Sequence, residues 1–136
     1  MNYLVDTNVI SELCRPQPHP AVLRWAERIE QHTLSVISVE EIWHGLAKRP
    51  SHRLTAWMED YVRQHDLIPI DVAIAQRAGE LRGAFARKGS IRTQADMLIA
   101  ATAQLHGLTL VTRNIRDFEG CGIGLLNPFA DGIAEG

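Results

Sequence analysis

The chain has 136 residues, of which 46% are hydrophobic and 22% are charged, and its formal net charge is −2. These proportions are those of an ordinary globular protein and exclude a disordered or fibrous chain. The slightly negative charge also excludes a general affinity for nucleic acid, so any bound polyanion needs a local site. At this length we expect a single domain, residues 1–136, with one core.

Neither a targeting signal nor a membrane segment is visible in the chain. Its start, MNYLVDTN, lacks the basic end and apolar stretch of a secretory signal. No apolar run approaches the roughly 18 residues that cross a bilayer. The two cysteines, Cys14 and Cys121, are not in a metal-binding spacing. We therefore expect a cytoplasmic protein with free thiols and neither a disulfide framework nor a zinc site.

Short apolar runs, which we expect to be strands buried on both faces, alternate with longer segments of helical period. Strands are predicted at Tyr3–Val5, Leu34–Ile37, Leu67–Ile70 and Leu108–Val111, with a short last strand within IGLLNP, residues 123–128. Helices are predicted from about Thr7, over 21–31, after Ser38, over 52–64, from an Asp71 cap to Gly89, and from Thr93 to Gly107. This alternation predicts an α/β fold with a parallel sheet that is covered by helices on both faces.

Four acidic residues lie where the predicted strands end or the predicted helices begin. Asp6 directly follows the first strand, and Glu41, Asp96 and Asp117 each lie three residues after a Ser, Thr or Asn. Taken singly, each can be a structural helix cap, because this spacing is that of a capping box. Open α/β sheets, however, bind ligands at the carboxyl ends of their strands. We therefore expect the four carboxylates to converge there.

Asp96 leads the uncharged stretch MLIAATA, which we expect to be buried, and a salt bridge to nearby Arg92 is one interpretation of its charge. Carboxylates that converge raise one another's pKa unless a cation compensates them. Mg²⁺ takes one or two carboxylates and leaves room for water and phosphate oxygens. The pattern therefore predicts a divalent-cation site that is open to a phosphate.

Four segments in this order carry a resemblance to a known family: YLVDTNVIS, SVISVEEIWHG, TQADMLIAATAQLHG and LTLVTRNIRDF. The chain resembles the PIN-domain ribonucleases, in particular the VapC-type toxins of bacterial toxin–antitoxin pairs, over nearly its whole length. The resemblance implies a PIN-like three-layer α/β/α sandwich with a central parallel sheet. It also implies an endoribonuclease in which Mg²⁺ or Mn²⁺ activates water to attack an RNA phosphodiester.

The family's site residues can be carried over by motif. The catalytic and metal-binding acids fall on Asp6, Glu41, Asp96 and Asp117. Glu40 is a rival to Glu41, which we prefer because the family pattern places the acid directly before an apolar residue. The polar supports fall on Asn8, Thr112 and Asn114. The implied partners are an RNA substrate, a cognate antitoxin, a second copy in a homodimer, and DNA only through the antitoxin.

Five basic residues near these acids have two interpretations. They are Arg87, Lys88, Arg92, Arg113 and Arg116. They either complement a helix end and face solvent, or form a local lip that grips RNA phosphates. The six histidines lack ligand spacing, and we assign none of them to catalysis. Amphipathic helices around 21–29 and 52–62 mainly supply core, and a groove between them is where the resemblance would seat an antitoxin.

A second class of function stays open: a PIN-like binding module, similar to FitB, that acts in a DNA-binding complex with a partner. Other acid-based folds are disfavoured. Phosphoryl transfer of the haloacid dehalogenase type needs an Asp where this chain has Asn8, and a receiver domain needs a Lys that residues 108–116 lack. The glycine-rich nucleotide motifs are also absent.

Overall fold

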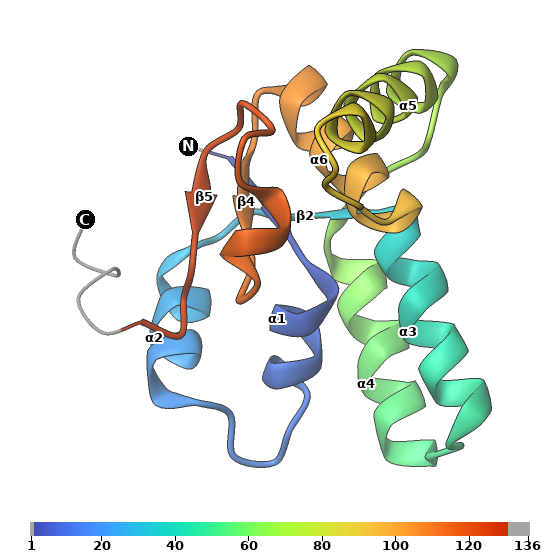
Figure 1. Ribbon diagram of the computed structural model, residues 1–136. Coiled ribbons are helices and arrows are strands. Elements are labelled where there is room, and N and C mark those ends of the chain that lie inside the picture. The colour runs from blue at the N-terminus through green and yellow to red at the C-terminus, as the bar shows by residue number, and fades with distance from the viewer. Residues whose placement is uncertain (1, 131–136) are drawn as a thin grey trace.

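The computed structural model describes residues 2–130, which form a parallel sheet between two layers of helices (Figure 1). The strands are β1 (Tyr3–Val5), β2 (His32–Ser35), β3 (Asp66–Ile68), β4 (Thr109–Val111) and β5 (Leu125–Leu126). All neighbouring strands pair in parallel, in the order β3-β2-β1-β4-β5. The predicted α/β fold with a central parallel sheet is thus confirmed.

The helices begin and end largely where the sequence predicts. They are α1 (Thr7–Leu13), α2 (Pro20–Arg28), α3 (Val36–Lys48), α4 (His52–Gln64), α5 (Val72–Arg87), α6 (Gln94–His106) and the 3₁₀ helix η1 (Ile115–Phe118). The Asp71 carboxylate caps α5 by accepting from the Ile74 amide at 2.9 Å. Gly107 ends α6 in the left-handed conformation, with φ of 64°. No helix among the described residues is long and apolar enough to span a membrane.

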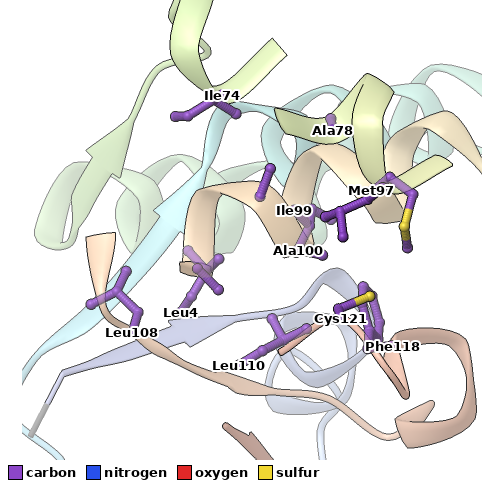
Figure 2. Close-up of a cluster of buried hydrophobic side chains, with 13 residues drawn as sticks. Leu4, Ile74, Ala78, Met97, Ile99, Ala100, Leu108, Leu110, Phe118 and Cys121 are labelled. Carbon is purple, nitrogen blue, oxygen red and sulfur yellow. The ribbon is translucent and has the colours of Figure 1, made fainter. Parts of the chain in front are cut away.

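Each strand of the central pair divides its side chains between two cores. Leu4 of β1 and Leu110 of β4 are fully buried with residues of α5 and α6, as Figure 2 shows around Ile74 and Met97. The next residues, Val5 and Val111, point to the other face and pack with residues of α1 to α4. This alternation follows from the period of two along a strand. It makes a three-layer sandwich with the sheet in the middle.

The second core contains most of the large aromatic side chains. Trp25 of α2 is 2% exposed, as predicted for a core residue. Trp43 and Trp57 are half-buried against the same cluster. Because they lie against core, these rings are explained by packing.

Two predictions at the second and third strands were wrong. β2 ends at Ser35 rather than Ile37, because the Ser35 hydroxyl accepts from the Ile37 amide at 3.0 Å and caps a helix that starts at Val36. Ser38 is therefore inside α3 and does not cap it. β3 lies at the edge of the sheet, and its Leu67 is 41% exposed, so it is not buried on both faces.

Candidate active site

Asp6 lies at the carboxyl end of β1, in the middle of the sheet. Its backbone N–H donates to the Val111 carbonyl at 2.9 Å, which extends the pairing of β1 and β4 by one residue. The side chain is 5% exposed. One carboxylate oxygen, Oδ1, accepts from the Thr7 amide at 2.8 Å, which makes Asp6 the N-cap of α1. The interpretation of Asp6 as a helix cap is therefore correct, but capping uses only one of its two carboxylate oxygens.

The other oxygen of Asp6 is held by two of the predicted polar supports. The Thr112 hydroxyl donates to Oδ2 at 2.8 Å, and the Asn8 amide donates to it at 3.2 Å. Asn8 in turn accepts from the Arg113 backbone N–H at 3.0 Å, so it joins α1 to the segment after β4. Burial raises the pKa of Asp6, the hydrogen bonds from Thr112 and Thr7 oppose that rise, and the charge of Glu41 adds to it.

Glu41 lies in the second turn of α3 and not at its start, so its capping-box interpretation was wrong. Its Oε1 lies 2.7 Å from the Thr7 hydroxyl, which is also 3.0 Å from the Ser38 hydroxyl. Ser38 is buried and one helical turn before Glu41, on the same face. The rival Glu40 is exposed. Only Glu41 therefore turns toward the Asp6 end of the sheet.

Thr7 and Ser38 are functional candidates that the sequence reasoning missed. Ser38 was misread as a cap, and Thr7 was passed over between Asp6 and Asn8. The signal was present, because once α3 begins at Val36 the spacing of Ser38 and Glu41 places both on one helix face. The signal was missed because the helix was predicted to start after Ser38, whereas it starts at Val36.

Asp96 occupies the first turn of α6, where the Thr93 hydroxyl accepts from its backbone N–H at 3.1 Å. The stretch that follows is buried as predicted, with Met97 and Ala100 fully inaccessible. The pKa of Asp96 is raised from 3.8 to about 6, first by burial and then by the charges of Asp6, Asp117 and Glu41, while a hydrogen bond with Thr93 opposes the rise. Asp96 therefore lies within electrostatic reach of the other three acids.

Asp117 sits in η1, on the exposed rim of this group. Its predicted capping partner Asn114 makes no side-chain cap bond, so the capping interpretation fails here too. Asn114 instead donates its backbone N–H to the Thr112 hydroxyl at 3.0 Å. Thr112 therefore links Asp6 to the turn that leads to Asp117.

The five basic residues are not equivalent in the structure. Arg87, Lys88 and Arg116 are exposed. The Arg113 guanidinium lies 4.7 Å from the centre of the Phe129 ring. Arg92 donates to the backbone carbonyls of Asp117 and Glu119 at 2.9 and 3.0 Å. Between Arg92 and Asp96, which are both described, there is no ion pair, so the salt bridge considered for Asp96 does not form.

The chemistry of these side chains fits a hard divalent cation. The side-chain atoms that could ligate an ion here are oxygens, mainly of carboxylates and hydroxyls. No basic side chain of the described region forms an ion pair with any of the four acids. Within residues 2–130 no three His, Cys, Asp or Glu side chains stand close enough together to ligate one ion. An ion here would take one or two carboxylates and complete its shell with water and substrate oxygens, which is the habit of Mg²⁺.

A hollow of about 400 Å³ opens beside Thr7 and Glu41. Its walls come from α1, α3 and α4, and its apolar lining includes Ile42, Leu54 and Met58. No residue of α2 lines it. Of the two predicted segments, 21–29 and 52–62, only the second contributes to this hollow, which runs from α4 to Glu41.

Comparison with known proteins agrees with this geometry. The model of the PIN domain family matches residues 3–120. The chain is 34% identical to the VapC ribonuclease Y4jK of Sinorhizobium fredii, with 93% of this chain and 96% of that protein covered. It is 33% identical to the toxin FitB of Neisseria gonorrhoeae, with 94% and 99% covered.

A solved structure with the same fold is the DNA-bound VapBC of Salmonella typhimurium. It is 27% identical, has a TM-score of 0.83, and the match covers 94% of this chain and 98% of that one. Asp6, Glu41, Asp96 and Asp117 all lie within the matched residues. The chain belongs to the PIN-domain family, within the group of VapC and FitB toxins.

Proposed function

We propose that this protein is a metal-dependent endoribonuclease that hydrolyses RNA phosphodiesters and serves as the toxin of a toxin–antitoxin pair. The observation that supports this most is Asp96, whose pKa is raised to about 6 by burial and by three neighbouring acids. A purely structural cluster would compensate such charges with arginine or lysine. A cluster left uncompensated is typical of a site that receives a cation with its substrate.

Asp6, Asp96 and Asp117 are the acids that would hold the ion, one or two of them directly and the rest through bound water, with Glu41 as either a ligand or a proton acceptor. When bound, a divalent ion lowers the pKa of water and stabilises charge on phosphoryl oxygens. The protein's own part is to fix where each carboxylate points. Thr112 and Asn8 orient Asp6, while Thr7 occupies one oxygen of Glu41 and leaves the second free to accept a proton.

The partners follow from the relatives and from the hollow beside the site. The VapBC complex of Salmonella typhimurium is described as DNA-bound, and we propose the same arrangement here, with DNA bound through an antitoxin. An antitoxin segment in the hollow would pack on Leu54 and Met58 and end over Glu41. We also propose that the protein forms a homodimer.

The alternative is a binding module without catalytic activity, and the similarity to FitB is the reason to test it. RNA cleavage discriminates the two. Purified protein, freed of metal and then supplied with Mg²⁺, should cleave RNA, and Asp6→Asn and Asp96→Asn should each lower the rate by more than about 100-fold, since loss of a ligand costs more than loss of its outer partner.

The matched control is Asp60→Asn, which removes an exposed acid of α4 that pairs with Arg63. It should cleave at the wild-type rate. If the wild type and Asp6→Asn degrade RNA equally, the activity is contamination and the nuclease proposal fails in favour of the binding module.

A further inference from the structure

Among the described basic residues near the acids, Arg92 makes the most side-chain hydrogen bonds, whereas one of its two interpretations placed it in an RNA-gripping lip. It lies in the connection between α5 and α6. Its two terminal nitrogens donate to the carbonyls of Asp117 and Glu119 at 2.9 and 3.0 Å, and Nε donates to the Ser90 hydroxyl at 3.3 Å. The guanidinium also lies over the Phe85 ring, 3.9 Å from its centre. Each of the three nitrogens therefore donates one hydrogen bond within the protein.

The two carbonyls belong to the segment that carries Asp117. They stand on either side of Phe118, which is 1% exposed and anchors η1 in the core. Asn114 provides no side-chain cap for this short helix. Beyond the Phe118 anchor, the side-chain contact that holds the Asp117 backbone among the described residues is the pair of bonds from Arg92.

Arg92 also precedes Thr93, the residue that caps α6 and positions the Asp96 amide. A rigid planar guanidinium thus joins the start of the Asp96 helix to the backbone of Asp117. Phe85 supports both sides of this bridge. It stacks under Arg92, and its ring is 3.4 Å from where a Cβ of Gly120 would lie.

We infer that Arg92 is a positioning residue, which sets the placement of the Asp117 carboxylate relative to Asp96 and does not bind RNA phosphate. This inference rests on the proposed metal site. An Asp117 segment that moves relative to α6 would present its carboxylate to the ion only part of the time. Removing the Arg92 side chain should therefore weaken metal binding even before any RNA is added.

Two measurements on RNA-free protein test the inference. Amide hydrogen exchange across residues 114–120 reports the segment itself, without metal. Titration of Mn²⁺, followed by the electron paramagnetic resonance signal of the free ion, reports the site. The variants are Arg92→Gln, Arg92→Lys and the control Arg116→Gln, which removes an exposed charge next to Asp117 but no hydrogen bond that the structure shows.

Arg92→Gln should speed exchange in residues 114–120 several-fold and weaken Mn²⁺ binding by about 10-fold, the usual cost of losing an outer partner of a ligand. Arg92→Lys should show nearly the same faster exchange and weaker Mn²⁺ binding, because one ammonium cannot bridge both carbonyls in a fixed plane. Arg116→Gln should exchange like the wild type.

Wild-type exchange and wild-type Mn²⁺ affinity in Arg92→Gln would overturn the inference. A higher KM for RNA and a shallower salt dependence in that variant, with both other readouts unchanged, would instead place Arg92 in the lip. If the wild type itself binds no Mn²⁺, the proposed metal site fails, and the exchange measurement still decides whether Arg92 holds the segment.

Discussion

At the scale of single residues, the Thr7 hydroxyl shows how the site is ordered. It has one proton and two oxygen neighbours, Glu41 Oε1 at 2.7 Å and Ser38 Oγ at 3.0 Å. An ionised carboxylate can only accept, so Thr7 donates to Glu41 and must itself accept from Ser38. The accepting carboxylate of Glu41 therefore fixes the direction of this chain of bonds, and the buried Ser38 is its first donor.

Replacing Thr7 by valine tests this chain. Thr7→Val keeps the backbone N–H that the Asp6 carboxylate caps and nearly the same shape, but removes the donor to Glu41. We expect the kcat of RNA cleavage to fall by about 10-fold or more, whereas Thr7→Ser should retain most of it. A Thr7→Val protein with wild-type kcat would show that Glu41 does not need this bond.

Asp96 gives a dependence of stability on pH in the metal-free protein. Because its pKa rises from 3.8 to about 6 on folding, the native state holds the proton more tightly, and its contribution to stability is lost as pH rises from about 4 through 6. Asp96→Asn should therefore raise Tm at pH 8 in EDTA and raise it much less at pH 4. An equal shift at both pH values would contradict the assignment.

At the scale of elements, how well the sequence predicts a helix or strand depends on how clearly specific residues mark its ends. The Asp71 cap and the Gly107 end were predictable because each carries a specific side-chain or backbone signal. The end of β2 was not, because Ser35 and Ser38 are both plausible caps and the intervening Val36 and Ile37 suit either a strand or a helix. Tertiary packing decides between them.

The start of β2 contains a histidine that should make the fold sensitive to acid. His32 is 5% exposed, 2.8 Å from the Tyr61 hydroxyl through Nδ1, and stacked on His65 at 4.8 Å. Burial, and then the charge of His65, lower the pKa of His32, and burial lowers that of His65. Their stabilisation is present above about pH 6.5 and is lost as pH falls through the native pKa values.

Substitution of His65 tests this stack. His65→Phe keeps an aromatic ring against His32 but removes one titrating group. The loss of Tm between pH 7 and pH 5 should be smaller in this variant than in the wild type. His52→Gln, at an exposed position at the start of α4, should lose as much as the wild type. Identical losses in all three proteins would rule out the stack as the acid-sensitive element.

At the scale of the whole molecule, the candidate site is a product of topology. Asp6 follows β1, Glu41 lies on α3, Asp96 on α6 and Asp117 on η1. Their convergence was predictable because parallel strands end at one edge of the sheet. The hydroxyl chain to Glu41 and the Arg92 bridge were not, since both join segments that only the packed layers bring together.

Expression of the whole protein without a partner should arrest bacterial growth if the ribonuclease proposal holds. Glu41→Gln should relieve the arrest, because its side chain cannot take a proton as the carboxylate does. Glu40→Gln is a close control, since Glu40 is exposed and one residue away. Unimpaired growth with folded wild-type protein would count against the toxin proposal. Equal relief by both variants would count against the assigned role of Glu41.

The measurement that tests the central claim most directly is calorimetric titration of Mn²⁺ into the metal-free protein. If the acids from separate elements form one cation site, the wild type and Asp60→Asn should bind with the same affinity. Asp6→Asn should bind at least about 10-fold more weakly. Equal binding by the wild type and Asp6→Asn would mean that the carboxylate at the end of β1 does not help to hold the ion.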